Sequence, residues 1–278
     1  MPQAEPISSR PRPVSSRLTG VWRQPNSNGP KARVHYPDSD GEPMGESFLH
    51  IDVATDARTV LLVHHADRAD ACVGGNNFVY YEEGNPRAVV VPDVFVVFGV
   101  PKRTDRRVFK VWEEGGRVPD FVLEVTSRKT RRNDEGEKKD LYERLGVTEY
   151  WQFDPTGDYL DPILKGRALA DGRYRELGLE RRDGGLCRLS EVLGLDLRLE
   201  DGRLRFFDPK RGEYLLTPEE QQQVNREQRQ ALDERDQALK ERDQALKERD
   251  RAVDQQRRAL EAAEARIREL ERQRRPGG

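Results

Sequence analysis

The chain has 278 residues, of which 35% are hydrophobic and 36% are charged, and its formal net charge is -2. This length allows one sizeable domain, because single cores stop growing near ~250 residues. The high polarity excludes a core that runs through the whole chain. The small net charge excludes attraction of a polyanion by the field of the whole molecule, so any such attraction must come from local basic clusters.

Cysteine usage and apolar runs narrow the class of protein further. Cys72 and Cys187 are the only cysteines and neither lies in a CxxC pair, which argues against a disulfide framework and a thiolate zinc site. No run approaches the ~20 apolar residues of a membrane span, and residues 1–17 lack the apolar stretch of an export signal. We therefore expect a soluble, cytoplasmic protein that does not enter a membrane.

The chain is expected to begin with an arm that precedes the folded domain. Residues 1–30 are rich in Pro, Ser and Arg and cannot bury enough surface to order, so this arm is predicted to be disordered. The globular domain is predicted over residues 31–217. The apolar spacing between residues 46 and 68 predicts its first helix, and residues 69–81 then become strand-like.

Two apolar, β-branched runs predict strands that are buried on both faces of a sheet. They are AVVVPDVFVVFG at 88–99 and PDFVLEVTS at 119–127. A helix is predicted over about 134–145, with acidic residues in its first turn and Gly146 as its C-terminal cap. Residues 150–153 resume a strand. This order predicts an α/β or α+β domain with a central sheet.

Residues 172–217 hold shorter strand candidates. Alternating apolar residues on both sides of Asp201-Gly202 predict a hairpin there. We expect this segment to complete or cover the central sheet.

A heptad pattern marks the last part of the chain, residues 218–278. The sequence QALDERD-QALKERD-QALKERD fills residues 230–250, and one apolar residue recurs at every seventh position: Leu232, Leu239, Leu246, Val253, Leu260 and Ile267. The pattern predicts a long coiled-coil helix. Its seam is poor, because an arginine follows each of the first three leucines at the position of a second apolar residue. We expect a homo-oligomer or a partner protein bound through residues 219–274; the alternative is a solvated single helix.

Glu124 and Asp93 are charged residues inside the two apolar runs. An ionised carboxylate in a buried strand is costly unless it is paired or bound to a metal. Pro92, just before Asp93, implies a strand edge or a bulge that turns the aspartate out of the regular pleat. Two carboxylates on neighbouring strands are the minimum set for a hard cation such as Mg²⁺.

Lys138 is the third candidate for the site. It shares a helical face with Leu141, Tyr142 and Leu145, so its side chain is expected to point toward the core. An ammonium there would pair with the carboxylates and offset the charge of a phosphodiester transition state. The alternative is an ion-pair cluster with a purely structural role.

The stretch PDFVLEVTSRKTRRNDEGEKKDLYERLGVTEYWQFDP at 119–155, preceded by VVVPDVFVV at 89–97, resembles the Uma-type restriction endonucleases of the PD-(D/E)XK nuclease superfamily. The resemblance covers roughly residues 40–217. It implies a restriction-endonuclease-like core, in which helices flank a mixed sheet, and a site for Mg²⁺, with Mn²⁺ as a substitute.

The resemblance also implies roles for particular residues. Asp93 would be the acidic residue of the PD element, Glu124 that of the (D/E)XK element, and Val125 would offer its backbone carbonyl to the metal. The chain departs from the superfamily pattern at Thr126, where lysine is usual. In the family that the chain resembles, the lysine is moved to the following helix, which points to Lys138.

Several other residues are weaker candidates. Lys139 and Lys129 compete with Lys138 for the role of the lysine. Glu46 matches the place where the superfamily often adds an acidic residue. Asp120 lies on the same strand face as Glu124 and is either an accessory residue of the site or part of a Pro-Asp turn at the start of the strand.

Four basic residues lie shortly after Glu124 in the sequence. Together with the basic segment 102–110, they are candidates for a phosphate-binding surface, and the alternative is an ordinary solvated loop. These nucleic-acid-binding candidates are Arg128, Lys129, Arg131 and Arg132.

The four histidines lack metal-ligand spacing, so the site is expected to exclude them; His64 and His65 are predicted to end a helix.

The sequence therefore predicts a divalent-metal-dependent endonuclease that hydrolyses phosphodiester bonds in DNA. The main alternative is a catalytically inactive binding or scaffold module that keeps the nuclease fold and associates through its coiled coil. RNA and branched or single-stranded DNA remain alternative substrates, and no segment predicts a recognition sequence.

Overall fold

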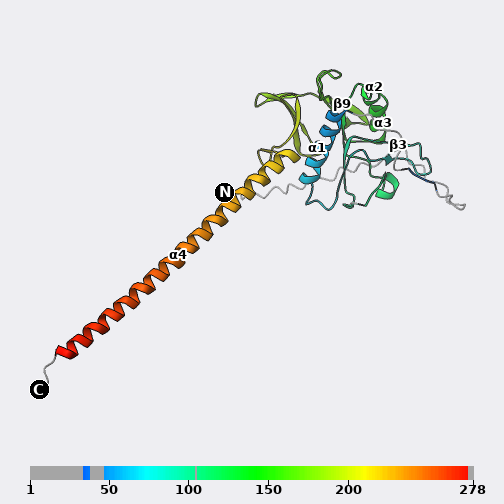
Figure 1. Cartoon of the computed structure of the whole chain (residues 1–278). Helices are drawn as coiled ribbons and strands as arrows, with labels where there is room; N and C mark the ends of the chain where they lie inside the picture. The colour runs from blue at the N-terminus through cyan, green and yellow to red at the C-terminus, as the bar shows by residue number, and fades with distance from the viewer. Residues whose placement is uncertain (1–33, 38–46, 104, 275–278) are drawn as a thin grey trace, which may run out of the picture. The chain divides into compact units, whose positions relative to one another are not determined.

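A computed structural model describes residues 34–37, 47–103 and 105–274 (Figure 1). The chain divides into two compact units, Met1–Pro218 and Glu219–Gly278. The predicted disordered arm at 1–30 lies outside the described residues. The first unit has a mixed α+β fold with central sheets and flanking helices, which confirms the predicted fold class.

The central sheet has six strands in the order β1-β4-β6-β7-β8-β9. Strands β6 and β7 run parallel, whereas the other neighbours are antiparallel. Two helices connect β6 to β7, as a parallel crossover requires. The strands of this sheet are β1 (Ala71–Gly74), β4 (Val94–Phe98), β6 (Phe121–Val125), β7 (Glu149–Phe153), β8 (Leu164–Ala170) and β9 (Arg173–Leu177).

Strand β6 is buried on both faces of the central sheet, as its apolar run predicts. Phe121, Leu123 and Val125 face a core that also contains residues of α1 (Phe48–His64) and of a second, five-stranded sheet formed by residues 180–214. Val122 faces the other core, which contains Tyr142 of the helix α3 (Glu137–Leu145). The alternation along the strand therefore places the Glu124 side chain on the α3 side of the sheet.

Within the segment 172–217, β9 belongs to the central sheet and the strands that follow it form a separate sheet. Five antiparallel strands are arranged in the order β10-β11-β12-β13-β14, and the apolar face of this sheet covers the central sheet through shared core residues. The hairpin at Asp201-Gly202 is confirmed, with φ of 48° and 75°, the left-handed pair that a two-residue turn needs. The strands are β10 (Glu180–Arg182), β11 (Gly185–Ser190), β12 (Leu195–Glu200), β13 (Arg203–Asp208) and β14 (Glu213–Tyr214).

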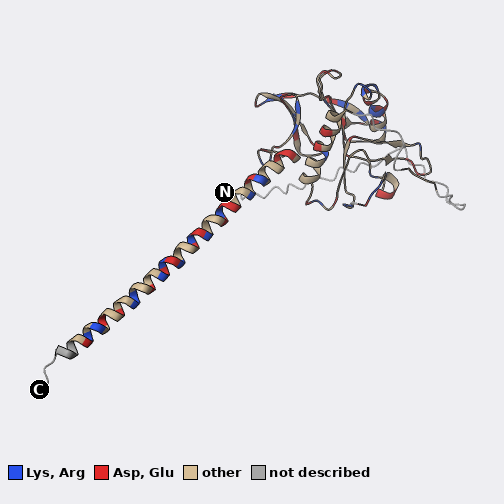
Figure 2. Cartoon of the chain, viewed as in Figure 1, with Lys and Arg blue, Asp and Glu red and all other residues tan. Residues whose placement is uncertain are grey.

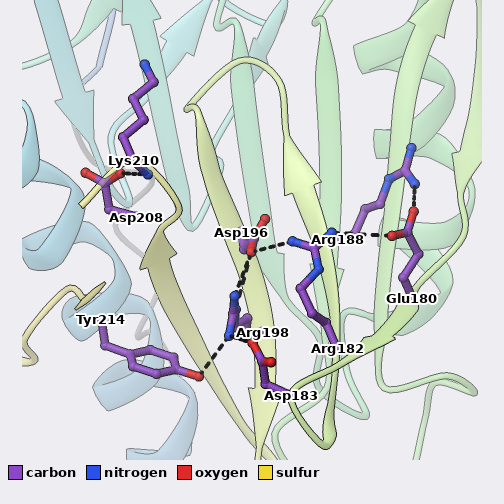
Figure 3. A network of polar contacts seen from close by, with 9 residues as sticks. All are labelled: Glu180, Arg182, Asp183, Arg188, Asp196, Arg198, Asp208, Lys210 and Tyr214. Carbon is purple, nitrogen blue, oxygen red and sulfur yellow. Dashed lines mark hydrogen bonds and ion pairs between the residues drawn. The ribbon is translucent and has the colours of Figure 1, made fainter. Parts of the chain in front are cut away.

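The polar face of this second sheet carries a network of ion pairs (Figure 3). Asp196 is buried and lies 3.1 Å from the guanidinium of Arg182 and 3.0 Å from that of Arg198. The Arg198 guanidinium also stacks on the ring of Phe207, 3.6 Å from its centroid. The charges at the centre of the network therefore neutralise one another, which fits a structural role.

The run at 88–99 is two strands in different sheets, where the sequence predicts one interrupted strand. Strand β3 (Val89–Val90) belongs to a three-stranded sheet with β2 (Val79–Tyr80) and β5 (Phe109–Lys110), and a 3₁₀ helix, η1 (Val111–Glu114), follows β5. The chain leaves β3 at Val91 and enters β4 after Asp93. Pro92 has no N–H to donate to a ladder, which explains the break.

The helix predicted at 134–145 begins earlier and is broken once. It consists of α2 (Arg131–Glu135) and α3, joined at Gly136, whose φ and ψ of -113° and -98° are not helical. A Cβ at Gly136 would lie 2.9 Å from the carbonyl oxygen of Arg132, so glycine permits this junction. The predicted end is confirmed, because Gly146 caps α3 with a left-handed φ of 87°.

His65 makes the stability of the first unit depend on pH. It directly follows α1, as predicted, and its buried ring packs against those of His64 and Phe98. Burial, followed by the charges of His64 and Arg68, lowers the pKa of His65 to about 4. The unfolded chain takes up this proton near pH 6.5, so the contribution of His65 to the free energy of unfolding is largest above pH 6.5 and falls as the pH approaches 4.

We expect His65→Gln to remove on the order of 2 kcal/mol of this pH-dependent loss. Urea unfolding of wild type and variant at pH 7.5 and pH 4.5 measures it. The exposed His35 provides the control, and His35→Gln should leave the difference between the two pH values as in wild type. The same pH dependence in wild type and His65→Gln would refute the assignment.

The second unit consists of the helix α4 (Pro218–Arg274), which confirms the predicted long C-terminal helix (Figure 1). Acidic and basic residues alternate along its described length without a block of one sign (Figure 2). The apolar residues of the heptads are exposed by 43% to 62%. None of the described helices is both long enough and apolar enough to cross a membrane.

Candidate active site

Glu124 is the last residue but one of β6 and is fully buried. The Tyr142 hydroxyl donates a hydrogen bond of 2.6 Å to its Oε1, and the Lys138 ammonium donates one of 2.9 Å to its Oε2. Both donors come from α3, which packs on this side of the sheet. The charge that interrupts the apolar strand is thus compensated by one neighbouring helix.

Asp93 lies next to Glu124, as the break after β3 allows. Its backbone N–H points to Glu124 Oε2 at 3.4 Å, and its own Oδ2 accepts a hydrogen bond of 2.7 Å from the Val125 N–H. The aspartate therefore bridges from the start of β4 to the end of β6. The structure brings the two predicted carboxylates together at one point on neighbouring strands.

Lys138 is the one of the three candidate lysines that the structure places against Glu124. Its Nζ also lies 3.5 Å from the carbonyl oxygen of Val91. Lys139 instead pairs with Asp140 at 3.2 Å, and Lys129 is exposed in the loop after β6. The surrounding carboxylates, Glu124 first, outweigh burial and raise the pKa of Lys138 above its ordinary value, so its side chain is a cation.

Asp134 belongs to the same cluster, and the sequence reasoning missed it. It is 1% exposed and its Oδ1 lies 3.5 Å from Lys138 Nζ, while within the described structure neither of its carboxylate oxygens accepts a well-formed hydrogen bond. The signal was present in the sequence, because Asp134 precedes Lys138 by four residues and one helical turn. The break at Gly136 does not separate the two side chains.

His50 is the second residue that the sequence reasoning missed, since histidines were excluded for lack of metal-ligand spacing. It is buried on α1, and its Nε2 lies 3.2 Å from Asp93 Oδ2. The signal was its helical spacing with the buried Ala54, Ala57 and Leu61, which places it on the core face of α1.

The cluster holds more acidic than basic side chains. Burial raises the pKa of Glu124 strongly; Asp93 and Asp134 raise it further, and Lys138 opposes them. Burial likewise raises the pKa of Asp134. Three carboxylates face one ammonium, so full ionisation leaves an excess of two negative charges, which a divalent cation would neutralise.

The donor set fits Mg²⁺, which takes oxygen ligands and usually one or two carboxylates while it keeps several waters. Asp93 and Glu124 supply two carboxylates, and each carboxylate can accept more contacts than it makes here. No cage of three or more His, Cys, Asp or Glu side chains that would hold a metal occurs among residues 34–37, 47–103 and 105–274.

The remaining site candidates are Val125, Asp120 and Glu46, and the structure gives a different outcome for each. Val125 contributes its N–H to Asp93, and the role of its carbonyl stays a prediction. Asp120 directly precedes β6, where its carboxylate accepts a hydrogen bond of 2.7 Å from the Phe98 N–H, so the structure places it in a strand-start contact. Glu46 lies outside the described residues.

The four basic candidates lie in the loop after β6 and in the first turn of α2, and all are exposed: Arg128, Lys129, Arg131 and Arg132. The segment 102–110 is less available for phosphates, because Arg103 and Arg106 pair with Asp105 and Glu114. Lys110 also pairs with Glu113.

The chain combines a mixed sheet flanked by helices with a Pro-Asp element before one strand and a glutamate in the next, as the resemblance to the PD-(D/E)XK nucleases implies. The model of the Uma2 family, described as "Putative restriction endonuclease", matches residues 23–235. The chain belongs to the Uma2 family, which confirms the resemblance seen in the sequence.

The other comparisons add less. A comparison with curated proteins finds no match. Among solved structures, the chain is similar to "a putative nuclease belonging to DUF820" from Anabaena variabilis ATCC 29413, with 13% identity and a TM-score of 0.37. This similarity covers 50% of the present chain and 74% of the other.

Proposed function

We propose that the protein is a divalent-metal-dependent endonuclease that hydrolyses phosphodiester bonds in DNA. The observation that carries the proposal is the burial of Glu124 in contact with the Asp93 N–H and the Lys138 ammonium, in a cluster that holds more acidic than basic groups. Family membership supports a nuclease, and the nuclease class acts on DNA. A purely structural cluster of ion pairs would pair each acidic group with a basic one, whereas this cluster holds three carboxyl groups beside one ammonium.

Asp93, Glu124 and the Val125 carbonyl are the groups that would hold Mg²⁺, with Mn²⁺ as a substitute. The ion, when bound, would make water a stronger nucleophile at neutral pH and stabilise charge on the phosphate. Lys138 stays protonated, so it acts on the charge that develops on the phosphate and does not take up a proton. Tyr142 orients Glu124 through its hydrogen bond.

A plasmid assay tests this function. We expect the purified protein to convert supercoiled plasmid to nicked and linear forms in Mg²⁺ or Mn²⁺, and to leave it intact in EDTA. Cleavage that continues at the same rate in EDTA would contradict the metal dependence. No cleavage in either ion, together with no binding of Mn²⁺ in calorimetric titration, would favour a nuclease fold without activity.

Arg128, Lys129, Arg131 and Arg132 are proposed as the phosphate contacts beside the site. Their exposure and their position directly after β6 support this role. Contacts of this type depend on the release of counterions, so DNA binding through them would weaken as salt increases. They would position the nucleic-acid backbone without reading its sequence.

Self-association through α4 is proposed as the role of the second unit. The exposed leucine row gives two copies one apolar stripe each, and from Val253 onward Ala263 and Leu270 widen that stripe. In a parallel pair the seam arginines of one copy lie beside the aspartates that follow them in the other: Arg235, Arg242 and Arg249 with Asp236, Asp243 and Asp250. This charge complementarity favours a second copy of the chain over an unrelated partner.

We expect the triple variant Leu246→Lys, Leu260→Lys and Ile267→Lys to halve the solution mass of the full-length protein. Like charges would then face one another at three levels of the seam. Light scattering coupled to size exclusion measures the mass. Gln237→Lys with Gln244→Lys, which fall outside the seam, form the control and should leave the mass unchanged. The same mass for the triple variant and wild type would contradict self-association through this face.

A further inference from the structure

The candidate active site opens to solvent mainly beside Lys138. The side chains of Glu124 and Asp134 are 0% and 1% exposed, that of Asp93 is 10% exposed and that of Lys138 is 16% exposed. Lys138 also lines a groove of about 500 Å³. The groove borders Lys138 and Val91 beside the carboxylates, so its walls bear on what can accompany a phosphate that approaches from this side.

One wall of the groove is apolar. It comes from the segment that joins β2 to β4, where Val89 and Val91 are half-buried and Tyr81 lies beside them. Leu141 of α3 also lines the groove and packs against the same core cluster as Tyr81. Half-buried aliphatic and aromatic side chains of this kind offer a flat surface to the face of a nucleobase.

The rim of the groove is polar and comes from α2 and α3. Asn133 and Arg144 are exposed there, with Glu137 between them. Three of the lining residues lie on one face of α3, because Glu137, Leu141 and Arg144 fall at offsets of four and seven residues. An asparagine amide can bond to a base edge, and a guanidinium can bond to a phosphate.

We propose that this groove binds one unstacked nucleotide of a single-stranded or locally unpaired nucleic acid and so places the adjoining phosphate at Lys138. The inference rests on the proposed nuclease function and specifies its substrate. A volume of about 500 Å³ suits a small-molecule-sized group. An intact duplex would have to extrude a nucleotide at the cost of its stacking and pairing, so single strands are preferred.

Binding in EDTA tests the inference apart from catalysis. Fluorescence anisotropy is measured for the full-length protein with labelled oligo(dT), oligo(U) and a hairpin duplex of equal length. The duplex is blunt-ended and joined by a non-nucleotide linker in place of the hairpin loop, so that it holds no unpaired nucleotide. We expect at least one single strand to bind about tenfold more tightly than this duplex. Equal or tighter binding of the duplex would overturn the proposal.

Variants localise the binding to the groove. Leu141→Trp fills the groove, and Arg144→Ala removes its guanidinium; each should weaken binding of the preferred single strand about tenfold. Arg175→Ala is the matched control, because Arg175 is exposed on β9 and pairs with Asp171 outside the groove. Unchanged binding by both groove variants, with thermal unfolding as in wild type, would overturn the proposal.

The outcome is separable from that of the nuclease proposal. Groove-dependent single-strand binding without cleavage in Mg²⁺ or Mn²⁺ would support the groove and contradict the enzyme. Metal-dependent cleavage that neither Leu141→Trp nor Arg144→Ala alters would support the enzyme and overturn the groove.

Discussion

Glu124→Gln is expected to reduce plasmid nicking in Mg²⁺ by at least about 100-fold, the magnitude typical of the loss of one preorganised electrostatic group. Glutamine retains the size of the side chain and an oxygen for the Tyr142 hydroxyl. It removes the charge that faces Lys138 and one of the two carboxylates proposed to hold the metal. Initial rates of plasmid conversion, compared at equal protein concentration, measure the effect.

Glu149→Gln is the matched control for this change. Glu149 is also a buried glutamate of the central sheet, but its carboxylate accepts hydrogen bonds from Trp151, Ser190 and Val192. Its replacement should lower the thermal stability and keep the rate of nicking per folded molecule. Equal nicking by Glu124→Gln and wild type would mean that the activity comes from another protein in the preparation.

Lys138→Met is expected to lower the rate of cleavage by about 100-fold as well, because it removes the cation that would stabilise charge on the phosphate. The loss should fall on kcat more than on KM, since the effect belongs to the transition state. Methionine keeps the length and apolar stem of the side chain that packs beside Glu124. Steady-state cleavage of a short labelled oligonucleotide separates the two constants.

Lys139→Met controls for a lost positive charge on the same helix. Lys139 pairs with Asp140, away from the carboxylate cluster, so its replacement should change kcat less than about twofold. Lys138→Arg should recover part of the activity, because it restores the charge without the geometry of an ammonium. A kcat for Lys138→Met equal to that of Lys139→Met would remove Lys138 from the proposed machinery.

The sequence predicted those parts of the fold that depend on local periodicity. The apolar runs predicted β4 and β6, Gly146 predicted the end of α3, and the heptads predicted α4. Pairing over long distances was harder to predict. Pro92 suggested an edge or a bulge, but whether the chain continues in one sheet or crosses to another depends on partners far away in the sequence. For the same reason the sequence left open whether residues 172–217 complete or cover the central sheet; in the structure residues 180–214 form a separate sheet that covers it.

The candidate site was predictable where charge conflicted with burial. Glu124 and Asp93 interrupt apolar runs, and the structure places them together with Lys138. Asp134 was missed because an acidic residue in a first helical turn has an ordinary explanation as a favourable dipole partner. His50 was missed because its contact with Asp93 joins residues 43 positions apart, across elements whose packing the sequence does not specify.

The most direct test is a crystal structure of the protein soaked in MnCl₂, with anomalous scattering used to locate the ion. The proposal predicts one manganese ion bound by the carboxylates of Asp93 and Glu124 at about 2.0–2.3 Å, with the Lys138 ammonium close to a water on that ion. An anomalous map with no manganese at these two carboxylates, from crystals of a protein that cleaves DNA in Mn²⁺, would contradict it.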